Sequence, residues 1–210
     1  MQKKSSHKPS YPRRPGPPQQ VRIIGGAWKR TPLPVLDAFG LRPTPDRVRE
    51  TVFNWINHQC DANWAKLQVL DLFAGSGALG FEAASRGAQS VTLIDSNTQV
   101  IRQLEEIKAK LKADNVQIMR GDAVATAQSA VTRGQQFDLI FLDPPYQQSF
   151  LERTLPLCAK LLKAGGMVYA ESGLALEFAD GEAPEWLAPW EIIRADKAGM
   201  VFYHLLKYKA

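Results

Sequence analysis

Short apolar runs alternate with amphipathic stretches over most of the chain. We expect buried strands at the VLD run before a glycine-rich turn and at SVTLID, VQIMRGD, FDLIFLD and GGMVYAES. A short helix is predicted over 78–86, and a longer one over 97–112, where Val100, Ile101, Leu104, Ile107 and Leu111 form one apolar face. Strands alternating with helices of this length predict an α/β fold with a doubly wound, mostly parallel sheet, which we expect to have seven strands.

The two ends of the chain depart from this alternation. Residues 190–208 indicate two strands around Lys197–Gly199, a connection too short for a crossover helix, and therefore predict a C-terminal antiparallel hairpin. Residues 21–35 predict a small N-terminal β-hairpin broken by Gly25 and Gly26. A helix follows, with Thr44 expected as its N-cap, Pro45 at its first position and an apolar stripe at Val48, Val52, Trp55 and Ile56.

Composition predicts the boundaries of the domains and the cellular location of the protein. With 210 residues and 45% hydrophobic content, the chain can bury one substantial core. We expect a basic, proline-rich disordered tail at 1–20, the hairpin and helix extension at 21–60 and the main domain at 61–210. No run approaches the roughly 18 apolar residues of a membrane span, and the N-terminus does not resemble a signal peptide, so a cytoplasmic protein without membrane contact is expected. The dispersed cysteines and histidines predict no metal site: Cys60, Cys158, His7, His58 and His204.

The basic residues are concentrated near the N-terminus. Residues 1–49 hold 11 Lys and Arg against 2 Asp and Glu, whereas the rest of the chain has a net charge of −4. This asymmetry favours contact with a polyanion, of which nucleic acid is the usual example, although the tail could serve only solubility. Arg42, Arg47 and Arg49 cluster at the helix start, either as a solvated face or as phosphate ligands. The residues that we expect to bind nucleic-acid phosphates are Lys29, Arg30, Arg42 and Arg47.

The glycine-rich turn is the first candidate site. Gly75, Gly77 and Gly80 match G-x-G-x-x-G between a strand and a helix, a pattern that also occurs in packing turns without a ligand. Asp71 ends the preceding strand, where a carboxylate would repel a pyrophosphate but attract a cationic cofactor. Asp95 ends the next strand and suits the hydroxyls of a ribose. We therefore expect S-adenosylmethionine rather than a nicotinamide cofactor.

A second candidate site is Asp143-Pro144-Pro145-Tyr146, directly after FDLIFL. Two prolines stiffen the loop and cannot donate backbone hydrogen bonds, so the loop presents acceptors. Acceptors that hold the N–H bonds of a planar amine would aim its lone pair at a methyl group, while Tyr146 stacks on the base. Alternatively, the prolines only end the strand.

These motifs together resemble a known family. DLFAGSGALG, Asp95, Gly121-Asp122-Ala123 and DPPY resemble the class I S-adenosylmethionine-dependent amino-methyltransferases, with a Rossmann-like fold. IIGGAWKRTPLPV and RPTPDRVRETVFN are similar to the bacterial 16S ribosomal RNA guanine-N2 methyltransferase family called RsmD, and the resemblance covers about residues 21–206.

The resemblance implies roles for individual residues and a substrate. The implied cofactor-binding residues are Asp71, Phe73, Gly75, Gly77, Asp95, Ser96, Asp122 and Ala123, and the residues implied to hold the target amine are Asp143, Pro144, Pro145 and Tyr146. The implied partner is 16S rRNA, free or in a small-subunit particle. DPPY alone would also fit methylation of adenine N6 or another amine, on RNA or DNA. A nicotinamide oxidoreductase and a non-catalytic RNA-binding protein are further alternatives.

Overall fold

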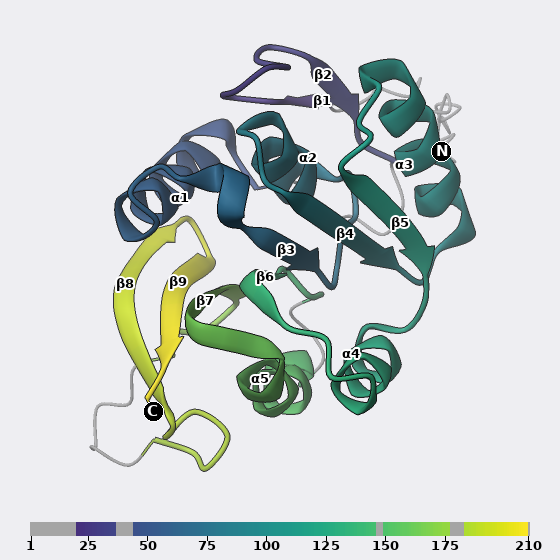
Figure 1. The fold of residues 1–210 in the computed structure, drawn as a ribbon. Coiled ribbons are helices and arrows are strands. Elements are labelled where there is room, and N and C mark those ends of the chain that lie inside the picture. The colour runs from purple at the N-terminus through teal and green to yellow at the C-terminus, as the bar shows by residue number, and fades with distance from the viewer. Residues whose placement is uncertain (1–19, 37–43, 146–148, 177–182, 210) are drawn as a thin grey trace, which may run out of the picture.

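The computed structural model describes residues 20–36, 44–145, 149–176 and 183–209 (Figure 1). The helices are α1 (Asp46–Gln59), α2 (Ala78–Ser85), α3 (Thr98–Leu111), α4 (Ala123–Thr132) and α5 (Phe150–Leu161), with a 3-10 turn at Trp64–Lys66. The strands are β1 (Gln20–Arg22), β2 (Pro32–Pro34), β3 (Gln68–Asp71), β4 (Ser90–Asp95), β5 (Val116–Arg120), β6 (Phe137–Leu142), β7 (Leu162–Ser172), β8 (Trp190–Ala198) and β9 (Val201–Tyr208).

Seven strands form one sheet in the order β5-β4-β3-β6-β7-β9-β8. Strands β5, β4, β3, β6 and β7 are parallel to one another, while β9 runs antiparallel to both β7 and β8. The predicted mostly parallel sheet with a C-terminal antiparallel hairpin is therefore confirmed. The chain order reverses between β3 and β6, so ligands are expected beyond the carboxyl ends of these two strands.

Helices cover both faces of the sheet (Figure 1). On one face, α1, α2 and α3 bury their apolar stripes in a cluster that includes Val52, Phe53 and Leu104. On the other face, α4 and α5 bury Ala127, Leu155 and other residues against the sheet. A sheet covered on both sides has no need for polar alternation, which explains the continuous apolar runs of β3, β4 and β6. No helix in the described ranges is long and apolar enough to cross a membrane.

The predicted N-terminal hairpin forms as a separate two-stranded sheet, in which β1 and β2 are antiparallel. Its turn is held against the end of α2, where the Ala27 backbone N–H donates to Ser85 O over 2.7 Å. A Cβ at Gly26 would lie 1.9 Å from that carbonyl oxygen, so glycine is required for this close approach. The proposed domain boundaries at residues 20 and 60 stay a prediction.

The expected N-cap of α1 is wrong. Pro45 occupies the cap position, no side chain caps the helix, and the Pro45 carbonyl accepts from the backbone N–H groups of Val48 and Arg49. The Thr44 hydroxyl instead donates to Glu171 Oε1 on β7, 2.7 Å away. A hydrogen bond from a hydroxyl to a carboxylate is stronger than one between a hydroxyl and a neutral backbone N–H at a helix end, which favours this tertiary contact.

Candidate functional site

Four acidic residues lie at or just beyond the carboxyl ends of four neighbouring parallel strands. Asp71 and Asp95 are the last residues of β3 and β4, Asp143 follows β6 directly, and Asp122 lies two residues beyond β5. Because β3 pairs with both β4 and β6, the first three lie along one edge of the sheet. These acids therefore lie at the edge where open α/β sheets bind their ligands.

Asp71 is buried in this edge with an unusual environment. Its Oδ1 accepts from the Phe73 backbone N–H at 3.3 Å, whereas Oδ2 is buried and has no hydrogen-bond partner among the described residues. Burial, and then repulsion by Asp95, raise the pKa of Asp71 to about 7. A buried acceptor without a partner is costly, and a cationic ligand would compensate that cost.

The glycines of the turn have different roles. Gly75 and Gly77 have φ of 50° and 77°, and the nearest heavy atom to a Cβ built on Gly75 would be Phe73 O at 4.0 Å. Gly75 therefore borders open space that a ligand can occupy. A Cβ at Gly80 would lie 2.0 Å from Leu93 Cδ2, so this glycine lets α2 pack on β4. The turn thus combines room for a ligand with close helix packing.

Asp95 organises the backbone around the turn. Its Oδ2 accepts from the Gly75 N–H at 3.0 Å and its Oδ1 from the Asn97 N–H at 2.8 Å. Each oxygen keeps a further lone pair that can accept from a ribose hydroxyl. The adjoining Ser96 is exposed. Asp122 is also exposed, and its Oδ1 caps α4 by accepting from the Ala125 N–H at 2.9 Å, while Ala123 is buried.

The Asp143-Pro144-Pro145 segment follows β6 beside the Asp71 edge. Phe141 of β6 is the register partner of Asp71, which places Asp143 two residues beyond the paired position. Asp143 and Pro145 are half-buried and Pro144 is buried. Burial, and then repulsion by Glu171 and Asp71, raise the pKa of Asp143 well above its ordinary value. Tyr146, the expected stacking residue, lies outside the described residues.

Glu171 was not predicted as a site residue, although its carboxyl lies next to that of Asp143. Glu171 is buried on β7, and its Oε1 accepts from the hydroxyls of Thr44 and Tyr169, each at 2.7 Å. Glu171 is a hydrogen-bonding neighbour of the Asp143 carboxyl. The only signal in the sequence was an acidic residue inside the apolar run MVYAES. The neighbouring Glu171 charge therefore contributes to the raised pKa of Asp143.

The basic residues expected to bind RNA differ in their exposure and position in the structure. Lys29 and Arg30 lie in the turn of the N-terminal hairpin, and Arg47 lies in the first turn of α1; all three are exposed. Arg42 lies outside the described residues. Arg49 is fully buried and donates to Thr44 O and to Asp46 Oδ1, so the interpretation of Arg49 as a phosphate ligand is wrong. The apolar side of α1 takes up this residue because Asp46 neutralises it.

The donors and acceptors at the edge fit S-adenosylmethionine. This cofactor carries a sulfonium and an ammonium, which suit the orphaned Asp71 oxygen, and a ribose, which suits Asp95. The open space beside Gly75 admits a ligand close to the backbone. No group of three or more His, Cys, Asp or Glu side chains suited to a metal ion is found in the part of the chain that the structure describes.

Comparisons with known proteins identify the family. The family model described as "Conserved hypothetical protein 95" matches residues 21–207. The ribosomal RNA small subunit methyltransferase D of Escherichia coli K12 is 40% identical over 193 residues, which cover 91% of each chain. The enzyme of the same name from Haemophilus influenzae Rd is 36% identical, covering 89% of this chain and 93% of that protein.

Solved structures give the same result. The putative methyltransferase yhhF from Escherichia coli superimposes with a TM-score of 0.77 at 39% identity, covering 91% of this chain and 99% of that one. The matched region includes the hairpin, α1, the glycine-rich turn and the Asp143 loop. The chain therefore belongs to the ribosomal RNA small subunit methyltransferase D family.

Proposed function

We propose that the protein transfers the methyl group of S-adenosylmethionine to the exocyclic N2 amine of a guanine in small-subunit ribosomal RNA. The observation that carries the proposal is the placement of the Asp143-Pro144-Pro145 acceptors on β6 beside Asp71 on β3, through the pairing of Asp71 with Phe141. An acceptor loop for an amine therefore adjoins a site suited to a cation. The names of the relatives at 40% and 36% identity support ribosomal RNA as the substrate.

The cofactor would be held along the edge formed by β3, β4 and β5. Asp71 would face its cationic groups and Asp95 its ribose, with the turn at Gly75 and Gly77 lying against it. The proposal also assigns to the cofactor the neighbouring residues Phe73, Ser96, Asp122 and Ala123. When bound, S-adenosylmethionine supplies the methyl group on a good leaving group, so the residues of the chain mainly orient the reactants.

The Asp143 loop would hold the guanine amine. Asp143 Oδ and the loop carbonyls accept from the two N–H bonds, which favours a pyramidal amine with its lone pair free. As the methyl group passes from the sulfonium, which leaves as a neutral thioether, to the amine nitrogen, the amine would lose one N–H proton, and the Asp143 carboxylate would accept that proton and pass it to water. This step needs Asp143 in its ionised form. Positive charge held beside Asp71 lowers the pKa of Asp143 and so prepares it for the step.

The RNA backbone would be held by cations away from the acidic edge. The exposed residues Lys29, Arg30 and Arg47, all N-terminal to the glycine-rich turn, are the proposed phosphate ligands, together with Arg42. Tyr146 would stack on the target base. A target that must reach a recessed acceptor loop is extruded from its helix, which single-stranded loops of RNA permit at low cost.

Methylation of purified 16S rRNA and of small-subunit particles from cells that lack the gene tests the proposal. We expect N2-methylguanosine at one position by nucleoside mass spectrometry, and the better of the two substrates identifies the natural one. Asp143→Ala should retain S-adenosylmethionine binding by calorimetry and lose single-turnover transfer. N6-methyladenosine as the product would replace guanine by adenine as the target, and no methylated nucleoside on either substrate would overturn the proposal.

A further inference from the structure

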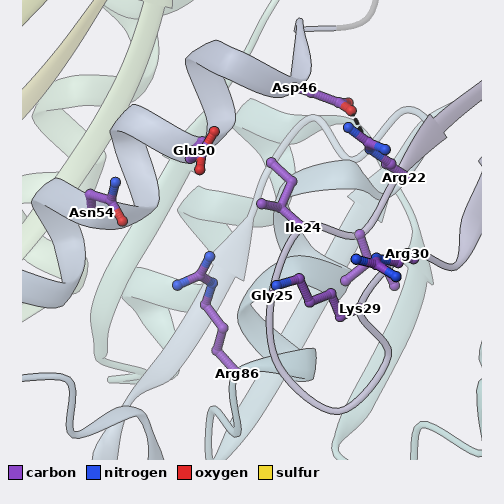
Figure 2. Close-up of a pocket in the computed structure, with 10 residues that line it drawn as sticks. Arg22, Ile24, Gly25, Lys29, Arg30, Asp46, Glu50, Asn54 and Arg86 are labelled. Carbon is purple, nitrogen blue, oxygen red and sulfur yellow. Dashed lines mark hydrogen bonds and ion pairs between the residues drawn. The ribbon is translucent and has the colours of Figure 1, made fainter.

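A groove of about 410 Å³ lies between the N-terminal hairpin, α1 and the end of α2 (Figure 2). Four basic side chains and two acidic ones line it, with Asn54 beside them: Arg22, Lys29, Arg30, Arg86, Asp46 and Glu50. The volume is of the order of a small-ligand site, and the lining is polar and net positive. These features suit an anionic group that carries hydrogen-bonding neighbours.

Arg86 points into the groove with its guanidinium held in place (Figure 2). Its Nε donates to Glu82 Oε1 at 2.7 Å, and its guanidinium carbon lies 4.9 Å from the centre of the Phe53 ring. Glu82 is fully buried and also accepts from the Ile24 and Gly25 N–H groups, so it is itself fixed. The Arg86 side chain is 14% exposed, and hydrogen bonds from Nη1 or Nη2 to other described residues are absent. Two oriented donors are therefore available to a ligand.

Gly25 makes room for this arginine. A Cβ on Gly25 would lie 2.8 Å from Arg86 Nη2, 3.0 Å from its Cζ and 3.2 Å from Glu82 Oε1. A side chain at this position would require the guanidinium to shift from where it lies against Glu82. Gly25 has no positive φ that would itself require glycine. Its small size is explained by the position of Arg86.

The acidic residues that line the groove do not cancel the positive charge of its basic residues. Asp46 is neutralised by Arg22 and by Arg49, each at 2.6 Å. Glu50 and Asn54 project from α1, across the groove from the hairpin turn that carries Gly25 and Lys29 (Figure 2). An anion is therefore favoured on the turn side. A carboxylate and an amide on the opposite wall suit the hydroxyl of a ribose or the edge of a base.

We propose that this groove binds one backbone phosphate of the substrate RNA, with Arg86 as the fixed bidentate donor and Lys29 and Arg30 as flexible cations. The inference rests on the proposed function, which supplies RNA as the ligand. A planar guanidinium already held in place loses little entropy on binding a phosphate. Asp46, on the wall of the groove, is two residues from Thr44, which contacts Glu171 beside Asp143. The start of α1 therefore contributes to both the groove and the surroundings of Asp143.

Phosphate ethylation interference on 16S rRNA tests this inference with Arg86→Lys. This variant keeps the positive charge but loses the two parallel donors of the guanidinium. We expect the parent protein to exclude RNA ethylated at one or a few phosphates, and the variant to lose that exclusion and to bind unmodified RNA about tenfold more weakly. The S-adenosylmethionine affinity of the variant should match the parent and circular dichroism should show that it stays folded, although losing the Arg86 Nε–Glu82 bond should lower its melting temperature. Arg133→Lys, on an exposed residue at the end of α4, is the matched control and should change neither pattern nor affinity.

Lys29→Ala provides a second test that does not touch the fixed arginine. We expect it to reduce the slope of log affinity against log salt by roughly 0.7 to 0.9, the effect of one lost phosphate contact. Identical interference patterns for the parent and Arg86→Lys, or an unchanged slope for Lys29→Ala, would overturn the inference. Methyl transfer is measured separately on unmodified RNA. If methyl transfer occurs but the interference pattern does not depend on Arg86, the proposed function stands and the groove proposal is wrong. If the pattern depends on Arg86 but no transfer occurs, the groove proposal stands and the proposed reaction is wrong.

Discussion

The hydroxyl of Thr44 donates a hydrogen bond of 2.7 Å to Oε1 of Glu171, a residue 127 positions further along the chain. Both residues are buried. Thr44 precedes α1 and Glu171 lies near the end of β7, beside the Asp143 carboxyl. The contact therefore attaches the N-terminal extension to the edge of the sheet where the amine is proposed to bind.

Thr44→Val is expected to lower the rate of methyl transfer without lowering the affinity for S-adenosylmethionine. The substitution leaves the buried Glu171 carboxylate with one donor fewer, a loss of about 1.5 to 3 kcal/mol in the free energy of unfolding. Chemical denaturation, calorimetry with S-adenosylmethionine and single-turnover transfer measure the three quantities. Thr51→Val is the control, because the Thr51 hydroxyl binds only Arg47 O of its own helix. Equal effects of the two substitutions would contradict a specific role for Thr44.

Glu171→Gln is expected to move the acid limb of the transfer rate to lower pH. Burial is the main cause of the raised pKa of Asp143 and Glu171 is the second, so removing the Glu171 charge lowers that pKa. Asp143 is then ionised over a wider pH range. Single-turnover rates between pH 5 and 9 check this shift. An acid limb at the same pH in both proteins would show that the Asp143 ionisation does not control the rate.

Asp71→Asn should stabilise the free protein at alkaline pH and abolish tight cofactor binding. Because the folded pKa of Asp71 is raised to about 7, its contribution to stability is fully present below the ordinary value of 3.8 and is lost as the pH rises through 7. Asparagine carries no charge and avoids that loss. We expect a higher melting temperature than the parent at pH 8 and a smaller difference at pH 5.

The same substitution tests the cationic ligand. In the parent, S-adenosylmethionine affinity should increase from pH 6 to pH 8 as Asp71 ionises, and in Asp71→Asn this part of the pH dependence should disappear. Calorimetry at both pH values measures it. An affinity of Asp71→Asn equal to that of the parent at pH 8 would remove Asp71 from the cofactor site.

Asp95→Ala and Asp95→Asn together separate two roles of Asp95. Alanine removes both the proposed ribose contact and the acceptor for the Gly75 N–H, and should weaken S-adenosylmethionine binding by about 1.5 to 3 kcal/mol. Asparagine keeps one acceptor oxygen, which can hold Gly75, but loses the charge. An affinity for Asp95→Asn between the parent and Asp95→Ala is expected. An unchanged affinity in both variants would reject the ribose assignment.

The order of the elements and the acidic edge could be predicted from local sequence patterns. Strand and helix periodicities, the glycine-rich turn and the short connection at Gly199 are local patterns, and each formed as predicted. Asp71, Asp95 and Asp143 could be placed at one edge because parallel strands carry their carboxyl ends to the same side.

The contacts between polar residues of distant segments could not be predicted in this way. Arg49 was expected on a basic surface and is buried beside Asp46, while Thr44 was expected to cap α1 and instead binds Glu171. Arg86 had no sequence signal at all, since its role depends on Glu82, Phe53 and the space left by Gly25. Periodicity depends on neighbours three or four positions away, whereas these contacts join distant segments. Their energies are set by burial and partner charge, which exist only once the helices have packed on the sheet.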